Sequence, residues 1–220
     1  MSNYNLNDLK IGEIKSALNF DKLPGVEAQL VLAPPYRAQL IEENKLNNNK
    51  NPRIAAVLIL LYKENNEWHF PVILRNTYKG VHSNQIGFPG GKVELQDKNL
   101  AATATRESFE EINSQVNDVE VLGQLTSLYI PPSNFIVHPF IGIYHQEPQF
   151  VPCDREVQQI IPIKLEDFMF NLKTVDLEIQ SKGKRTLVPS YELPDGLKIW
   201  GATAMMLSEF YVFIKKSLNL

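Results

Sequence analysis

Residues 88–113, FPGGKVELQDKNLAATATRESFEEIN, constrain the fold and chemistry of this chain of 220 residues more than any other segment. The segment begins with a glycine turn and ends with three glutamates, Glu107, Glu110 and Glu111. Residues three and four apart share one face of a helix, so a helix over residues 98–112 would present these carboxylates together. Carboxylates are ligands that suit a hard divalent cation such as Mg²⁺. A solvated acidic face is the alternative, and the glycine turn upstream favours the metal site.

The same residues resemble the Nudix box, the motif of the Nudix hydrolases. That motif has a glycine, five residues, an acid, seven residues, Arg-Glu, an apolar residue, one more residue, Glu-Glu, one more residue and a glycine. Gly91 opens the box here, Asp97 takes the acid position, and residues 106–111, RESFEE, supply the second half. The resemblance implies an α+β fold, an α/β/α sandwich with a mixed β-sheet, and a hydrolase.

Several positions depart from this pattern. Asp97 replaces a glutamate, and eight residues rather than seven separate it from Arg106. Ser108 occupies an aliphatic position, and Asn113 and Ser114 replace the closing glycine and apolar residue. Asn tolerates the left-handed conformation in which that glycine would end the helix, so we expect the change at 113 to be mild.

A second pattern lies just upstream of the box. Arg75 follows an apolar segment, His82 and Gln85 come next, and residues 88–91, FPGG, complete it. This is similar to the signature of the coenzyme A pyrophosphatase branch, apart from Asn84 at a glycine position. Residues 128–142, DREV near 156 and IWGATA at 199–204 are also similar to that branch, and the resemblance covers residues 52–215.

The resemblance implies a set of metal ligands and a cofactor. Glu107, Glu110 and Glu111 would bind Mg²⁺ or Mn²⁺ together with the carbonyl oxygen of Gly91. Glycine suits this position because the absence of a Cβ lets its backbone approach an ion closely.

Other residues receive catalytic roles from the same resemblance. Arg106 would orient a catalytic glutamate, although an i,i+4 pair with Glu110 is its simpler interpretation. Glu156 lies in a loop from which some Nudix enzymes supply a base or a further ligand, and it could equally be a surface glutamate. Asp97 is a plausible N-cap of the acidic helix.

Three residues of the upstream signature, Arg75, Lys79 and His82, are expected to bind a phosphate-rich substrate. Arginine offers a planar set of donors to phosphate oxygens, and histidine offers a further donor. The alternatives are a strand-end surface cation, a solvated loop lysine and a hydrogen-bonded loop anchor. Gln85 is expected to fix the loop backbone.

By resemblance, the reaction is hydrolysis of the pyrophosphate bond of coenzyme A or an acyl derivative. The products would be 4′-phosphopantetheine, or its acyl form, and adenosine 3′,5′-bisphosphate. Another nucleoside diphosphate derivative, such as NADH or ADP-ribose, is the main alternative. A nucleotide-sensing module without activity is less favoured, because none of the three glutamates is lost.

Composition adds limits on partners and location. A net charge of −3 gives no basic surface for a nucleic acid, and the longest apolar run, residues 54–62, is too short to span a bilayer. The single cysteine, Cys153, fits a reducing compartment, and the N-terminus lacks the pattern of a secretory signal. We expect a cytoplasmic protein with a coenzyme A-like substrate and no membrane or nucleic-acid partner, and leave a homodimer open.

The chain is expected to form an N-terminal extension, residues 1–51, and a Nudix domain, residues 52–220. A short helix over 5–20 and a polar loop at 45–51 are predicted in the extension. Apolar runs predict strands at 54–62, 69–75, 119–128, 135–144 and 157–163, with a turn at 63–68. The segment 202–218 has apolar residues at helical spacing and predicts a C-terminal helix packed on the core.

Overall fold

The structure is a computed structural model that describes residues 6–35, 37, 51–77, 84–181 and 184–220. The helices are η1 (Leu6–Asp8), α1 (Ile11–Ala17), α2 (Gly25–Leu30), α4 (Leu100–Ile112), η2 (Val116–Asp118), α5 (Leu165–Phe170) and α6 (Gly201–Ser217). The strands are β1 (Arg53–Glu64), β2 (Glu67–Arg75), β3 (Ile86–Gly87), β4 (Gly90–Lys92), β5 (Val119–Gln124), β6 (Leu128–Ile130), β7 (Phe135–Tyr144), β8 (Val157–Lys164), β9 (Lys173–Ser181), β10 (Lys184–Glu192) and β11 (Lys198–Trp200). No helix in these ranges is long and apolar enough to cross a membrane.

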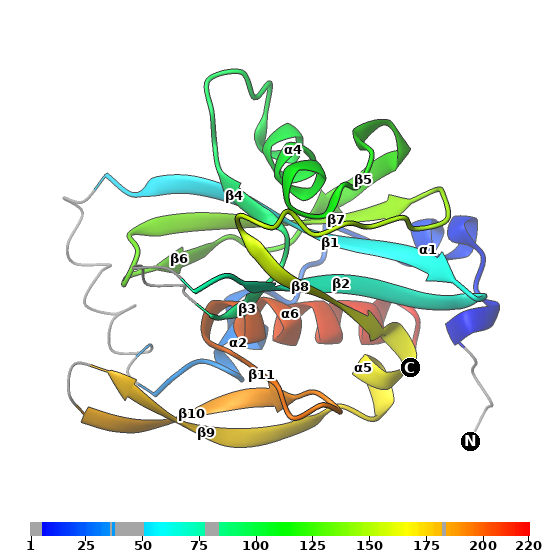
Figure 1. Ribbon diagram of the computed structural model, residues 1–220. Helices are drawn as coiled ribbons and strands as arrows, with labels where there is room; N and C mark the ends of the chain where they lie inside the picture. The colour runs from blue at the N-terminus through cyan, green and yellow to red at the C-terminus, as the bar shows by residue number, and fades with distance from the viewer. Residues whose placement is uncertain (1–5, 36, 38–50, 78–83, 182–183) are drawn as a thin grey trace.

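Strand β1 is the centre of a mixed sheet of eight strands. It pairs in parallel with β7, from Arg53 opposite Phe135 to Leu61 opposite Ile143, and antiparallel with β2 and β4. The strands β9, β10 and β11 form a separate antiparallel sheet, drawn at the bottom of Figure 1. The predicted mixed sheet is therefore confirmed.

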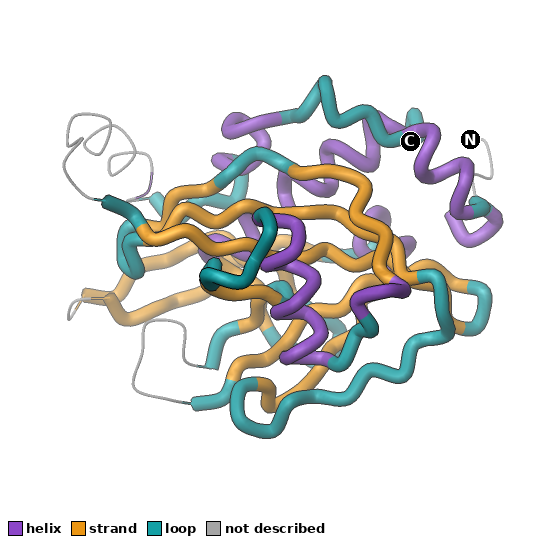
Figure 2. The backbone as a smooth tube through the Cα atoms, turned by 90° about the horizontal axis from the view of Figure 1, so that it is seen from above, coloured by secondary structure: helices purple, strands orange, loops and turns teal. Residues whose placement is uncertain are grey.

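Both faces of β1 are covered, because successive side chains of a strand point to opposite sides. Leu58 and Leu60 belong to the cluster under α4, whereas Ile59 and Leu61 belong to the core that contains α6. Figure 1 shows α4 above the main sheet and α6 between this sheet and the smaller one, and Figure 2 shows α4 lying across the strands. This arrangement is the expected α/β/α sandwich.

The N-terminal residues pack into the same core. Leu6 and Ile14 are buried, and α2 packs against α6. The buried Glu209 of α6 accepts hydrogen bonds from the backbone N–H of Gly25 at 3.2 Å and from Nε2 of Gln29 at 2.8 Å. The first part of the chain therefore fills the core together with the C-terminal helix.

Most predicted strands are present, with differences at several elements. The strand expected at 119–128 is interrupted between β5 and β6, and the helix expected at 5–20 is confined to η1 and α1. Residues 45–50 of the predicted loop lie outside the described residues. The turn between β1 and β2 places Asn65 and Asn66 at φ values of 51° and 65°. The second sheet was not predicted.

Candidate active site

The box helix, α4, begins and ends at asparagines. Oδ1 of Asn99 accepts a hydrogen bond from the backbone N–H of Ala102 at 2.8 Å, so Asn99 is the N-cap, and the expected cap at Asp97 is wrong. Asn113 ends the helix in the left-handed conformation, with φ 60°, as predicted. Asn84 also has a positive φ, 55°. Asparagine therefore replaces glycine at both positions without changing the backbone conformation that is needed there.

Asp97 binds Arg106 instead of capping the helix. Its Oδ1 accepts from Nε of Arg106 at 2.8 Å, and its Oδ2 accepts from Nη2 at 3.1 Å. The hydrogen bonds from Arg106 hold the pKa of the Asp97 carboxyl well below its usual range. The shorter acid and the extra residue before Arg106 thus still bring carboxylate and guanidinium together.

Arg106 also contacts the glutamates of its own helix. Its Nη2 lies 3.0 Å from Oε1 of Glu107 and donates to the carbonyl oxygen of Lys92 at 3.0 Å. Its Nη1 lies 3.1 Å from Oε2 of Glu110. The arginine therefore makes the simple i,i+4 pair and the contact with Glu107 at the same time, and it connects α4 to β4.

The carboxylate of Glu107 lies directly against the backbone of Gly91. A Cβ at position 91 would clash with all three atoms of that carboxylate, so a larger residue here would displace Glu107 from its place. Burial raises the pKa of Glu107 above its usual value, Arg106 opposes the rise, and the negative charges of Glu110 and Glu156 add to it. Glu107 is thus a half-buried carboxylate surrounded by other carboxylates, a setting that a cation would stabilise.

Glu111 points into the protein, whereas Glu110 is 53% exposed, so the prediction that the helix presents its three carboxylates together is wrong for Glu111. Its side chain is 2% exposed; Oε1 accepts from Nη1 of Arg75 at 2.7 Å and Oε2 from the backbone N–H of Gly90 at 2.8 Å. Burial raises the pKa of the Glu111 carboxyl to about 7, whereas Arg75 and the Gly90 amide limit the rise. In the described part of the chain, no three His, Cys, Asp or Glu side chains gather closely enough to hold a metal ion.

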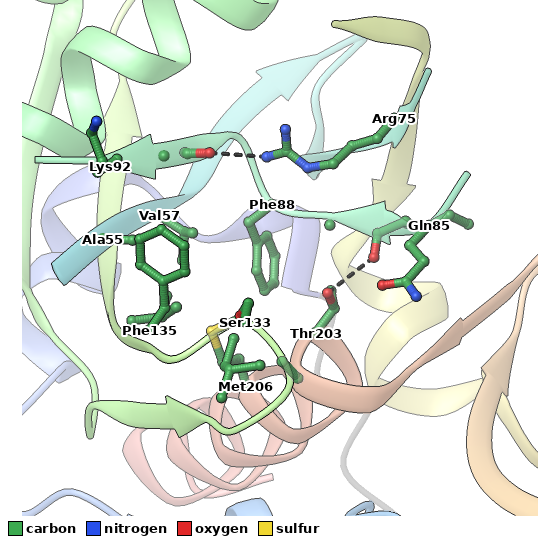
Figure 3. A pocket seen from close by; sticks show the side chains of 17 residues that line it. Ala55, Val57, Arg75, Gln85, Phe88, Lys92, Ser133, Phe135, Thr203 and Met206 are labelled. Carbon is green, nitrogen blue, oxygen red and sulfur yellow. Dashed lines mark hydrogen bonds between the residues drawn. The ribbon is translucent and has the colours of Figure 1, made fainter. Parts of the chain in front are cut away.

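Arg75 connects Glu111 to the strand beside it. Besides its pair with Glu111, its Nη2 donates to the carbonyl oxygen of Gly90 at 2.9 Å, as Figure 3 shows. Arg75 is therefore neither a strand-end surface cation nor a guanidinium with all its donors open to a phosphate. The other two predicted substrate-binding residues, Lys79 and His82, lie outside the described residues.

The loop that carries Glu156 runs along the end of α4. The backbone N–H of Cys153 donates to the carbonyl oxygen of Glu111 at 2.9 Å, and that of Val151 donates to Ile112 at 3.1 Å. Glu156 is exposed, and its charge raises the pKa of Glu107. Two residues far apart in sequence are thus close enough to interact electrostatically. The catalytic role of Glu156 stays a prediction.

The two serines that depart from the box are hydrogen-bonded to each other. Oγ of Ser114 donates to Oγ of Ser108 at 2.8 Å, and both residues are fully buried. A polar pair therefore occupies a place where the family pattern has two apolar positions.

Replacing only one of these serines should be more harmful than replacing both. We expect Ser108→Ala to lower the free energy of unfolding by about 1–3 kcal/mol, because it leaves the Ser114 hydroxyl buried without its partner. The Ser108→Ala/Ser114→Ala variant should lose less than the sum of the single variants. Urea denaturation of the four proteins measures this coupling, and strict additivity would show that the hydrogen bond is energetically irrelevant.

A cavity of about 220 Å³ lies beside β4, and we call it the β4 cavity. Gly90, Gly91 and Lys92 form part of its rim, and Figure 3 shows side chains from β1, β6–β7 and α6 converging on it. Its wall is mainly apolar, formed by residues that include Ala55, Val57, Phe88, Phe135 and Met206. No sequence pattern predicts Lys92, Ser133 and Phe135 at this cavity, because only the pairing of β1 with β4 and β7 brings them together.

Comparisons with known proteins agree with this geometry. A family model described as the NUDIX domain matches residues 52–186. "Nudix hydrolase 15, mitochondrial" from Arabidopsis thaliana is 34% identical over 163 residues, which are 71% of this chain and 56% of that protein. The chain therefore spans little more than half of the plant protein. "Uncharacterized Nudix hydrolase NudL" from Yersinia enterocolitica is 32% identical over 176 residues, covering 78% of this chain and 86% of that protein.

A solved structure extends the agreement to the fold. The MutT/nudix family protein from Enterococcus faecalis superposes with a TM-score of 0.50 over 96% of this chain and 79% of that one, at 13% identity. One assignment agrees with the box residues around Gly91 and Glu107, with the α/β/α sandwich and with the sequence relatives. The chain belongs to the Nudix hydrolases.

Proposed function

We propose that this chain hydrolyses the pyrophosphate bond of coenzyme A or an acyl-coenzyme A in a reaction that depends on Mg²⁺ or Mn²⁺. The products would be 4′-phosphopantetheine, or its acyl form, and adenosine 3′,5′-bisphosphate. The observation that supports this most is the position of Glu107 on Gly91, with the β4 cavity bordered by the same glycine. One substrate could place its pyrophosphate at the carboxylates and an uncharged part in the cavity. The upstream signature from Arg75 to Gly91 favours coenzyme A as that substrate.

The carboxylates at the site have the donor chemistry that suits a divalent cation, and in the described residues no three of them converge on one point. Nudix hydrolases generally use divalent metal ions, and the charge of Glu107 is repelled here by those of Glu110, Glu111 and Glu156. We assign the cation to Glu107 and Glu110 with the carbonyl of Gly91. Glu111 would complete the site from its buried position, since each of its oxygens accepts one hydrogen bond and keeps a second lone pair. When bound, the cation neutralises phosphate charge and activates a water.

The remaining residues position these groups. Arg106 holds Glu107 through their contact of 3.0 Å and is itself fixed by Asp97. Arg75 holds Glu111 and Gly90, which keeps β4 at its distance from α4. Glu156 reaches the site from its loop and is our candidate for the base that takes a proton from the attacking water.

Two alternative functions differ from this proposal, one in its substrate and the other in the absence of hydrolysis. A Nudix pyrophosphatase acting on NADH or ADP-ribose would use the same carboxylates and differ in what recognises the rest of the substrate. A nucleotide-sensing module would bind nucleotides without hydrolysis. The three box glutamates argue against it, because all are present and Glu107 lies against Gly91.

A substrate panel with Mg²⁺ or Mn²⁺ separates these three functions. We expect the highest kcat/KM with coenzyme A or an acyl derivative, compared with dephospho-coenzyme A, NADH, ADP-ribose and nucleoside triphosphates. Mass spectrometry of the products should find 4′-phosphopantetheine and adenosine 3′,5′-bisphosphate. Preference for ADP-ribose or NADH would replace coenzyme A as the substrate, and binding without turnover of any compound would support the sensing module.

A further inference from the structure

The short strand β3 connects two parts of the candidate active site. It pairs with β2, and at the end of this pairing the backbone N–H of Arg75 donates to the carbonyl oxygen of Gln85 at 3.1 Å. The glycine turn that contains Gly90 and Gly91 follows β3 directly along the chain. A displacement of β3 would therefore move both the backbone of Arg75 and the start of the box.

The carbonyl oxygen of Ile86 in β3 is held by helix α6. Hydrogen-bonded and non-hydrogen-bonded pairs alternate along an antiparallel ladder. The pair of Arg75 with Gln85 is hydrogen-bonded, so the next pair, Leu74 with Ile86, is not, and the Ile86 carbonyl points away from β2. Oγ1 of Thr203 donates to this carbonyl at 2.9 Å, and both residues are buried (Figure 3). The first turn of α6 thus holds β3 on the side that β2 leaves open.

The side chains of Thr203 and Arg75 both lie beside Gly87, the second residue of β3. A Cβ placed on Gly87 would lie 3.8 Å from Oγ1 of Thr203 and 3.9 Å from Nε of Arg75. Arg75 in turn donates to Oε1 of Glu111 at 2.7 Å and to the carbonyl oxygen of Gly90 at 2.9 Å. Continuous contacts therefore run from α6 through β3 and Arg75 to a buried glutamate of the box.

We propose that Thr203 is a positioning residue for the hydrolytic site. Its hydroxyl fixes β3, and β3 keeps Arg75 at the place from which it holds Glu111 and Gly90. This rests on the proposed function only in that hydrolysis depends on the position of Glu111, whichever compound is the substrate. Residues 199–204, which have no other role in the proposed reaction, thereby acquire one.

Steady-state kinetics of Thr203→Val test this role, because valine keeps the shape of the side chain and removes the hydroxyl. We expect kcat to fall about tenfold to hundredfold at saturating Mg²⁺, since a misplacement of about 1 Å at a reacting group can cost about 10²-fold. KM should change little, because the lost hydrogen bond is made within the protein and not to the substrate. Thr203→Ser retains the hydroxyl and should keep most of kcat. The substrate is whichever compound of the panel is cleaved.

Ser208→Ala separates positioning from general destabilisation. Ser208 is also buried on α6, and its Oγ donates to the carbonyl oxygen of Ala28 in α2 at 2.7 Å. Each of the two variants loses one buried hydrogen bond of α6, so both should melt a few degrees below wild type. Only Thr203→Val should lose kcat. An equal loss of kcat in Ser208→Ala would overturn the proposal.

Hydrogen exchange of the Gly90 amide tests the same contacts without turnover. This N–H donates to Oε2 of Glu111 at 2.8 Å, and we expect it to exchange about tenfold faster in Thr203→Val than in wild type or Ser208→Ala. Thr203→Ala takes the place of the valine variant if that variant does not fold.

Three results would decide against the positioning role. Unchanged exchange at Gly90 or unchanged kcat in Thr203→Val would each show that β3 keeps its place without the hydroxyl. A loss confined to KM would mean that Thr203 contacts the substrate from the wall of the β4 cavity. If no compound of the panel is cleaved, the proposed function fails by itself, and the exchange of the Gly90 amide alone decides the role of Thr203.

Discussion

Replacing Arg75 by alanine should lower the free energy of unfolding by about 3–5 kcal/mol at pH 9, the usual loss when one partner of a buried ion pair is removed. The remaining Glu111 is 2% exposed and would keep only the Gly90 amide as its donor among the contacts described here. Without Arg75 the pKa of Glu111 should rise above about 7. A carboxyl whose pKa is higher in the folded state lowers the free energy of unfolding as pH rises toward that pKa. In the wild type this loss ends above the Glu111 pKa of about 7, whereas in the variant it continues to higher pH. The difference in unfolding free energy between the two proteins should therefore grow above pH 7. Urea denaturation at pH 6 and pH 9 measures this difference.

Two comparisons isolate the buried charge as the cause. Adding Glu111→Gln to Arg75→Ala removes that charge and should recover stability at pH 9. Lys164→Ala breaks a pair of 2.8 Å with Glu67 whose side chains are 47% and 37% exposed, and should cost less than about 1 kcal/mol. An Arg75→Ala variant as stable as wild type at pH 9, with a raised KM for coenzyme A, would instead restore Arg75 to the role of a phosphate-binding residue.

Replacing Glu107 by glutamine should reduce kcat roughly 10²–10⁴-fold and leave the metal-free protein folded. The amide keeps the shape that fits against Gly91 and removes the charge proposed to hold the cation. Wild type should gain about 1.4 kcal/mol of stability when Mg²⁺ is tenfold above its dissociation constant, whereas the variant should gain much less. Steady-state kinetics and thermal melts with and without Mg²⁺ give the two readouts.

Glu147→Gln is the matched control, because Glu147 is an exposed glutamate in the loop after β7. It should keep both its turnover and its response to Mg²⁺. Near wild-type kcat in the Glu107 variant at saturating Mg²⁺ would mean that the carboxylate has a structural role on Gly91 and no catalytic one.

The sequence indicated the box helix well and misplaced one of its glutamates. Ala104, Ser108 and Ile112 are four residues apart, so helical spacing predicts one shared face for them, and all three are buried. Glu111 is three residues after Ser108 and therefore belongs to this same face. Helical spacing alone could have predicted its burial. Its partner could not be predicted in this way, because Arg75 lies 36 residues away and reaches it only through the sheet.

The second sheet illustrates a weaker signal. Val175, Leu177 and Ile179 alternate with polar residues along β9, the pattern of a half-buried strand. This pattern could have predicted the strand. The β4 cavity is different, since its lining comes from β1, β4, β7 and α6 at once. No local pattern marks Ser133 or Phe135, and only the three-dimensional pairing of the strands places them beside Gly91.

The way residues 6–34 share a core with α6 has a consequence for how the molecule unfolds. The match to the NUDIX domain begins at residue 52, yet Leu6 and Ile14 are buried in the same cluster as Phe210, and Gln29 holds the carboxylate of Glu209. A cooperative unit is defined by shared buried contacts and not by the borders of a sequence family. The N-terminal helices and the C-terminal helix should therefore lose their structure in one transition, and amide protons of Ile14 and Phe210 should exchange with similar protection.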